Sequence, residues 1–266
     1  MRVISLKIFS ILFFVFSIHT ISSQNLSNQY VQQSARNIPV IKTVDVVIIG
    51  GSVSAVAAAV SAEKNGATVF LIESKPYLGE DLCATLRLKQ EPDILPKTDL
   101  ERKIFDESGS TTPMRVKGVL SEELIKAGVE FVYGSFVTDV IWNDDNEPAG
   151  IIVANRAGRQ AVVAKTIIDA SEHAAFCKLA GAKFKSFAEN TLEFERTIVL
   201  PGKTEDNPVY ERTKFRLPMP DLSYKSFAKA EQLARKKTYN KEQLRASESL
   251  FFVPPNPVIC KKAPEE

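Results

Sequence analysis

The sequence is poor in histidine and cysteine and has almost no excess charge, and each shortage excludes a class of function. Two histidines (His19, His173) and three cysteines (Cys83, Cys177, Cys260) occur in 266 residues. They are too few and too scattered for a zinc cluster, a disulfide scaffold or a histidine-based triad. Lysine and arginine total 34 against 32 acidic residues. We therefore expect neither a metal site nor a nucleic-acid partner.

Glycine and proline are also scarce, with 12 and 14 residues, which excludes collagen-like and low-complexity chains. The remaining composition, 44% hydrophobic and 25% charged, is that of an ordinary globular protein. The length allows one large domain or two small ones.

Long apolar runs are absent after the N-terminus, and the first 23 residues have the pattern of a secretory signal peptide. Arg2 and Lys7 precede an apolar run from Ile8 to Ile18, and Ser22–Ser23 supplies small residues near a cleavage site. The run is shorter than the roughly 20 residues that span a bilayer. We predict export to the periplasm or the extracellular space, with no stable membrane insertion after cleavage. An uncleaved membrane anchor is the alternative.

The chain before the first strand is polar and aperiodic, which predicts a linker over residues 24–43. The fold is expected to begin at Val44. There VDVVIIG forms a β-branched run that ends at Gly50 and Gly51, as in a parallel strand buried on both faces.

A helix and a second strand follow this glycine turn. The segment SVSAVAAAVSAEK is dense in alanine and valine, and Asn65–Gly66 suits the end of a buried helix. The next run, TVFLIE, predicts a buried strand that ends in Glu73. Strand, turn, helix and strand together predict a right-handed βαβ unit.

Such a unit can bind a dinucleotide, because the turn presents backbone N–H groups and the positive end of a helix dipole to a pyrophosphate. Glu73 would accept hydrogen bonds from a ribose and disfavour the 2′-phosphate of NADP. Against G-x-G-x-x-G/A, Ser52 replaces the second glycine, so its side chain must point away or donate its hydroxyl. A βαβ unit without a ligand is the alternative. The candidate cofactor-binding residues are Gly50, Gly51, Ser52, Ser54, Ala55 and Glu73.

The middle of the chain adds a helix and a β-meander. The segment RVKGVLSEELIKAG puts an apolar stripe on one helical face, formed by Val116, Val119, Leu120, Leu124 and Ile125. A short strand, VEFVYG, follows it. Three β-rich stretches near 135–142, 149–154 and 160–164 are separated by turn residues. They predict a meander inserted before TIIDA, a strand that returns to the parallel sheet.

With these segments the sequence resembles the bacterial FAD-dependent oxidoreductases, which have a glutathione-reductase-like Rossmann domain. The resemblance covers roughly Val44 to Lys262. The segment PYLGEDLCATLRL, from Pro76 to Leu88, corresponds to the LGG-type segment of the family. The resemblance implies FAD as the cofactor and flavin-mediated hydride transfer as the activity.

The resemblance also implies further cofactor contacts. Backbone groups at Val137 would meet the adenine, and Ala170 and Ser171 would lie near the cofactor in the segment that reads Asp-Ala-Thr-Gly in the family. Here Glu172 takes the place of the glycine, and its charge is expected to weaken binding at the pyrophosphate end.

Catalytic residues stay unknown at this stage, because a flavin performs the hydride transfer itself. Cys83 falls in the segment that the resemblance places near the flavin, although a lone cysteine is more often a packing residue. His173 could act as an acid or base, or it could cap a helix. The absence of a CxxC pair argues against a dithiol reductase.

The C-terminal part predicts β-rich and then charged helical segments, followed by a proline-broken tail. The resembled family returns to its flavin domain through a late Gly-Asp element, and nothing after Cys260 supplies one. We expect this chain alone to be a poor catalyst even if it binds FAD. The predicted layout is a signal peptide (1–23), a linker (24–43), an α/β Rossmann-like FAD-binding domain with a parallel sheet and inserted meander (44–188), and a partial substrate domain with tail (189–266).

Three functions remain open on the sequence. The first is an exported FAD-dependent oxidoreductase acting on a small-molecule substrate, either complete or working with a separately encoded C-terminal half. The second is a truncated, catalytically inactive FAD- or dinucleotide-binding protein. The third is a nucleotide or ADP-ribose binding module without redox chemistry.

Overall fold

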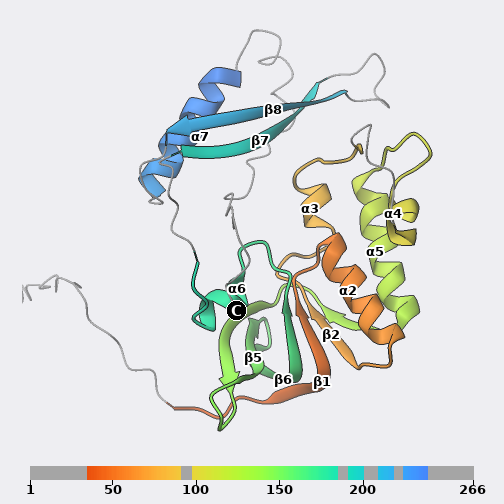
Figure 1. The fold of residues 1–266 in the computed structure, drawn as a ribbon, viewed down its shortest axis with the longest axis vertical. Coiled ribbons are helices and arrows are strands. Elements are labelled where there is room, and N and C mark those ends of the chain that lie inside the picture. Colours follow the sequence, from red (N-terminus) through yellow and green to blue (C-terminus); the bar gives the residue numbers. More distant parts are fainter. Residues whose placement is uncertain (1–34, 91–97, 185–190, 201–208, 219–223, 239–266) are drawn as a thin grey trace, which may run out of the picture. The chain divides into compact units, whose positions relative to one another are not determined.

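The structure, a computed structural model, describes residues 35–90, 98–184, 191–200, 209–218 and 224–238. The chain divides into two compact units, Met1–Asn37 and Ile38–Glu266. Every named strand and helix belongs to the second unit (Figure 1). The predicted signal peptide lies outside the described residues. Within these residues, no helix combines the length and hydrophobicity needed to cross a membrane.

A six-stranded sheet forms the centre of the Rossmann-like domain, with the strand order β3-β2-β1-β6-β5-β4. β1 pairs in parallel with β2 and β6, and β2 pairs in parallel with β3. β5 pairs antiparallel with β4 and β6, which forms the meander. The predicted α/β fold class is confirmed. The strands are β1 (Val40–Ile49), β2 (Val69–Ile72), β3 (Glu130–Val132), β4 (Phe136–Trp142), β5 (Pro148–Asn155) and β6 (Gly158–Asp169).

Two strands are longer than the sequence predicted. β1 begins at Val40, so residues 40–43 of the predicted linker are part of the sheet, where they pair with β6 across an irregular register. β6 runs without a break from Gly158 to Asp169. The third meander strand and the returning strand are therefore one element, since no turn residue interrupts the chain between them.

Helices cover one face of the parallel strands. α2 (Val53–Lys64) and α5 (Pro113–Ala127) pack there in a core that also contains Ile48 and Leu71. Of the stripe predicted for α5, Val116, Leu120 and Leu124 are fully buried, whereas Ile125 is 67% exposed. Ile125 therefore lies outside the buried part of the predicted stripe, because one further residue turns the side chain by about 100° around the helix.

The meander covers the opposite face. Val47 and Ile49 of β1 and Phe70 and Ile72 of β2 point into a second core, which they share with residues of β4, β5, β6 and α6 (Ala175–Leu179). Successive side chains of a strand point to opposite faces. The unbroken apolar runs of β1 and β2 therefore supply both cores at once, as expected for strands covered on two sides.

Two short helices, α3 (Glu80–Cys83) and α4 (Asp99–Ile104), were not predicted. α4 begins with a capping box in which the Thr98 hydroxyl accepts the N–H of Glu101 and the Glu101 carboxylate accepts the N–H of Thr98. The T-x-x-E spacing was present in the sequence as a signal for this start.

The described residues of the C-terminal part form a two-stranded antiparallel sheet and one helix. These elements are β7 (Thr191–Leu200), β8 (Val209–Pro218) and α7 (Tyr224–Thr238). The predicted order of strands followed by a charged helix is therefore seen. The part of that predicted helical stretch from residue 239 onward lies outside the described residues.

Gly79 is a glycine outside the β1–α2 turn whose replacement should disturb the fold. Its φ is +79°, and an added Cβ would lie 2.5 Å from Cγ1 of Val116 and 2.9 Å from Cδ1 of Leu120. Gly79→Ala should lower the free energy of unfolding by about 2–4 kcal/mol through backbone strain and overpacking. Gly118, inside α5, has open space around it, so Gly118→Ala should instead stabilise by up to about 1 kcal/mol. Urea unfolding of both variants tests the opposite signs.

Candidate functional site

The turn between β1 and α2 requires glycine at two consecutive positions. Gly50 has a φ of +111°, and a Cβ there would lie 2.4 Å from the carbonyl oxygen of Ala170. A Cβ on Gly51 would lie 2.5 Å from Oε2 of Glu73 and 2.7 Å from Cδ2 of Leu78. The backbone of the Ala170 segment therefore accounts for Gly50, and the side chains of Glu73 and Leu78 account for Gly51. The turn places the start of α2 at the carboxyl end of the parallel strands, where open α/β sheets bind ligands.

Ser52 occupies the second glycine position of the motif as the N-cap of α2. Its hydroxyl oxygen accepts the N–H of Ala55 at 3.2 Å and lies 2.9 Å from the hydroxyl of Ser54. The side chain is therefore turned toward the first turn of the helix. Ala55 is fully buried, which agrees with the need for a small residue at the third motif position.

Glu73 follows β2 directly and is only 4% exposed. Its Oε1 accepts the backbone N–H of Lys75 at 2.6 Å and the hydroxyl of Ser74 at 3.1 Å. Burial raises the pKa of Glu73, although these hydrogen bonds and one from the backbone of Gly51 act in the opposite direction. The predicted ribose-binding acid thus lies beside the glycine turn.

Ser171 has a structural role that the sequence did not predict. Its hydroxyl donates to Oδ1 of Asp169 at 2.6 Å and accepts the N–H of Ala175 at 2.8 Å. Oδ2 of Asp169 accepts the N–H of Cys177 at 2.9 Å. These bonds hold the start of α6, so the Ser171 side chain is already engaged. Ala170 continues the β1 pairing, since its N–H donates to the carbonyl of Ile49 at 2.8 Å.

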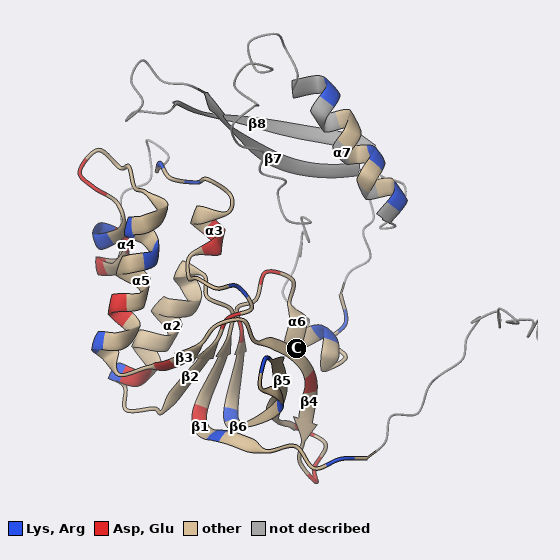
Figure 2. Cartoon of the chain, turned by 180° about the vertical axis from the view of Figure 1, so that it is seen from behind, with Lys and Arg blue, Asp and Glu red and all other residues tan. Residues whose placement is uncertain are grey.

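Acidic residues gather beyond the glycine turn, and Lys75 lies among them. Figure 2 shows acidic positions on α3 and on the loops at the carboxyl ends of the strands. Nζ of Lys75 lies 3.0 Å from Oε1 of Glu80, and this pair raises the pKa of Lys75. Burial raises the pKa of Glu172, as does the neighbouring charge of Glu80, while Lys75 lowers it. Lys75 thus offsets part of the charge expected to disturb a pyrophosphate.

Sequence reasoning missed Lys75, Glu80 and Asp81. Asp81, in α3, directs both carboxylate oxygens toward the backbone nitrogen of Val53, each at 3.3 Å. Glu80 could have been noticed, because it occupies the second glycine position of an LGG-type segment. The contact between Asp81 and Val53 had no sequence signal, since it depends on how the Gly79 segment is tied to the glycine turn.

The remaining candidate residues lie in separate elements. Val137 lies in the edge strand β4 beside a register shift that leaves Thr138 between two paired positions. Cys83 is buried, and desolvation raises the pKa of its thiol to about 11. His173 precedes α6, and burial lowers the pKa of its imidazole. In the described part of the chain, no hydrogen bond joins Val137 to the glycine turn.

The sequence model of the family described as FAD dependent oxidoreductase matches residues 45–255. The chain belongs to this family. FAD is therefore its cofactor. A separate comparison with curated protein sequences finds no match to the chain. The residues present fit the nucleotide half of FAD, because no side chain projects from Gly50 or Gly51, Ser52 is turned into its helix, and Glu73 lies beside the turn.

Among solved structures, the chain is similar to the THI4 protein of Thermovibrio ammonificans, with 20% identity and a TM-score of 0.43 over 53% of this chain and 64% of that one. A geranylgeranyl bacteriochlorophyll reductase-like protein of Thermoplasma acidophilum is similar with 17% identity and a TM-score of 0.48, over 74% of this chain and 62% of that one. The L-proline dehydrogenase of P. horikoshii is similar with 13% identity and a TM-score of 0.45, over 75% of this chain and 77% of that one. The chain spans less than two thirds of the first two proteins. None of these similarities carries a conclusion about its substrate.

The raised pKa of Glu73 predicts a pH-dependent contribution to stability. A carboxyl group whose pKa is higher in the folded state than in the unfolded state stabilises the fold below its unfolded pKa and loses that contribution as pH rises. Relative to wild type, Glu73→Gln should therefore become progressively more stable as pH rises above about 4, the ordinary pKa of a glutamate. Glu122 has a pKa lowered by its pairing with Lys126, so Glu122→Gln should lose stability relative to wild type as pH rises toward about 4 and show no further change above it. Urea unfolding at several pH values measures both; parallel slopes would contradict the assignment.

Proposed function

We propose that this protein is an exported FAD-dependent oxidoreductase that transfers a hydride between its flavin and a small-molecule substrate. The main support is the turn of Gly50 and Gly51, which is packed against Glu73 at the start of α2. The family match supports the same cofactor and reaction class. Export is inferred from the N-terminal pattern of the sequence.

The residues of the turn and of β2 would divide the binding of the cofactor. Backbone N–H groups at the start of α2 would bind the pyrophosphate, helped by the helix dipole. Glu73 would accept hydrogen bonds from the adenosine ribose, and its charge would disfavour a 2′-phosphate. Both elements are fixed by the sheet, so they would orient the cofactor without rearranging the core.

Bound FAD supplies the hydride chemistry, so few protein groups need to react. The Cys83 thiol, with a pKa raised to about 11, is protonated near neutral pH and is a poor nucleophile. Its Sγ contacts the carbonyl oxygen of Pro113 at 3.7 Å, which is a packing position. His173, with its lowered pKa, is neutral near pH 7 and able to accept a proton. We therefore favour His173 over Cys83 as a group for proton transfer.

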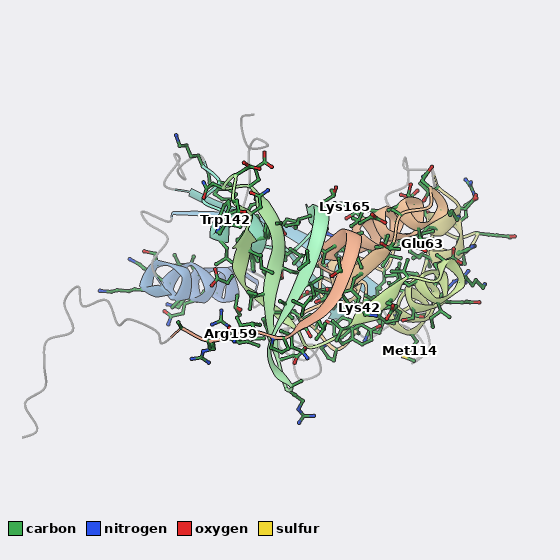
Figure 3. All side chains as sticks on the ribbon, turned by 90° about the horizontal axis from the view of Figure 1, so that it is seen from below. Lys42, Glu63, Met114, Trp142, Arg159 and Lys165 are labelled. Carbon is green, nitrogen blue, oxygen red and sulfur yellow. The ribbon has the colours of Figure 1, made fainter. Side chains whose placement is uncertain are left out.

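Purified protein should bind FAD and acquire a flavin absorption spectrum. Saturation at a hundredfold excess over Kd adds about 2.7 kcal/mol of stability, which a thermal shift measures. Glu73→Lys should abolish the shift because it removes the ribose acceptor. Glu63→Lys makes the same charge change at the C-terminal end of α2, away from the glycine turn (Glu63 is labelled in Figure 3), and should keep the thermal shift. NADP should give no shift. A colourless wild-type protein with no FAD shift would contradict the proposal.

Expression of the full chain should give a product cleaved near residue 23 outside the cytoplasm. The mature chain would be formally neutral, because Arg2 and Lys7 are lost with the leader. No arginine pair precedes the apolar run, so the chain should cross the membrane unfolded and acquire FAD afterwards. Cell fractionation and intact mass measure this outcome. Full-length, uncleaved protein in the cytoplasm would contradict export and leave the proposed FAD chemistry intact.

A further inference from the structure

Asp81 binds the N-terminus of α2, the position where the proposed function places the pyrophosphate. Both of its carboxylate oxygens lie 3.3 Å from the backbone nitrogen of Val53, the first residue of α2. The segment that carries Asp81 is tied to the turn itself, since the N–H of Gly79 donates to the carbonyl of Gly51 at 2.7 Å. The contact therefore follows from the packing of α3 on the glycine turn.

The carboxylate and a phosphate would use the same feature of the helix. The first N–H groups of a helix have no partner within the helix, and its dipole favours a negative group there. Ser52 already accepts the N–H of Ala55 with its hydroxyl and that of Val56 with its carbonyl. With Val53 directed at Asp81, side chains of the chain itself accept two of the first N–H groups of α2, those of Val53 and Ala55.

The groups around Asp81 make a second anion unfavourable while its carboxylate remains in place. Glu80 precedes it and carries the same charge, which is partly offset by Lys75. Burial raises the pKa of Asp81 against the lowering effect of the Val53 N–H, and the charge of Glu80 raises it further. Asp81 is nevertheless among the exposed residues, so its side chain can rotate into solvent without moving the core.

We propose that Asp81 is an internal competitor for FAD: its carboxylate occupies the pyrophosphate position on α2 in the free protein and must leave when the cofactor binds. This inference rests on the proposed function, because it assumes that FAD binds at the Gly50–Ser52 turn. It assigns to α3 a control of cofactor affinity that neither the glycine turn nor Glu73 provides. The free protein gains a capped helix, and FAD binds more weakly as a result.

Two substitutions separate competition from a general structural role. Asp81→Asn removes the charge with little change in shape, and Asp81→Ala removes the acceptor altogether. Both should lower the Kd for FAD by about tenfold, equivalent to about 1.4 kcal/mol. Asp81→Ala should at the same time lower the melting temperature of the FAD-free protein, because α2 loses a partner at its N-terminus. Weaker folding together with tighter binding would not result from simple disruption of the site.

The matched control is Asp99→Asn, which removes an acidic charge from the first turn of α4. Asp99 pairs with Arg102 and also interacts with Lys64 in the last turn of α2, at the end away from Val53. Asp99→Asn should leave the Kd for FAD within about twofold of wild type, because the charge it removes lies near the far end of α2 from Val53.

Titration of flavin fluorescence with FAD itself as the probe decides the matter. Tighter binding by both Asp81 variants than by wild type supports the inference. Unchanged or weaker binding by a folded Asp81→Asn protein overturns it and leaves the proposed function standing. If neither wild type nor any variant binds FAD, the proposed function fails and the inference with it. Should Asp81→Ala not fold, the comparison of Asp81→Asn with Asp99→Asn still gives the result.

Discussion

Glu73 packs against Gly51 at the carboxyl end of the parallel strands, and this contact joins the segments on which the site depends. A Cβ on Gly51 would overlap the Glu73 carboxylate, so the turn and the acid must be adjacent. The N–H of Glu73 donates to the carbonyl of Val132 at 2.9 Å, and its carbonyl accepts the N–H of Ser135 at 3.1 Å. One buried acid thereby fixes the relative positions of the glycine turn, β2 and the end of β3.

A buried carboxylate is costly unless it is hydrogen-bonded. Glu73 receives the backbone N–H of Lys75 and the hydroxyl of Ser74, yet its pKa is still raised by burial. A structural role alone would be served by an apolar residue of similar size at lower cost. The presence of an acid at this position is better explained by a polar ligand that uses it, which agrees with the ribose contact proposed above.

The sequence was sufficient for the elements whose residues interact locally. The βαβ unit followed from apolar runs that end at Gly50–Gly51 and Glu73, because strand burial and turn chemistry are written in short segments. The meander followed in the same way from turn residues between β-rich stretches. The approach of Asp81 to Val53 could not be predicted, because it depends on the tertiary packing of segments far apart in the sequence. The bonds between Asp169 and Ser171 are local, and their Asp-x-Ser spacing was available in the sequence as a turn signal.

Three side chains around the glycine turn have a related physical effect on the free protein. Ser52 caps α2, Asp81 accepts the N–H of Val53, and Glu80 pairs with Lys75. Each supplies from the chain itself a partner that a bound pyrophosphate would otherwise provide to the same region. A chain exported unfolded, as proposed, must fold before it meets its cofactor. Stabilising the free helix end with side chains is then an advantage during folding, and it necessarily weakens the binding of any anion that requires the same N–H groups.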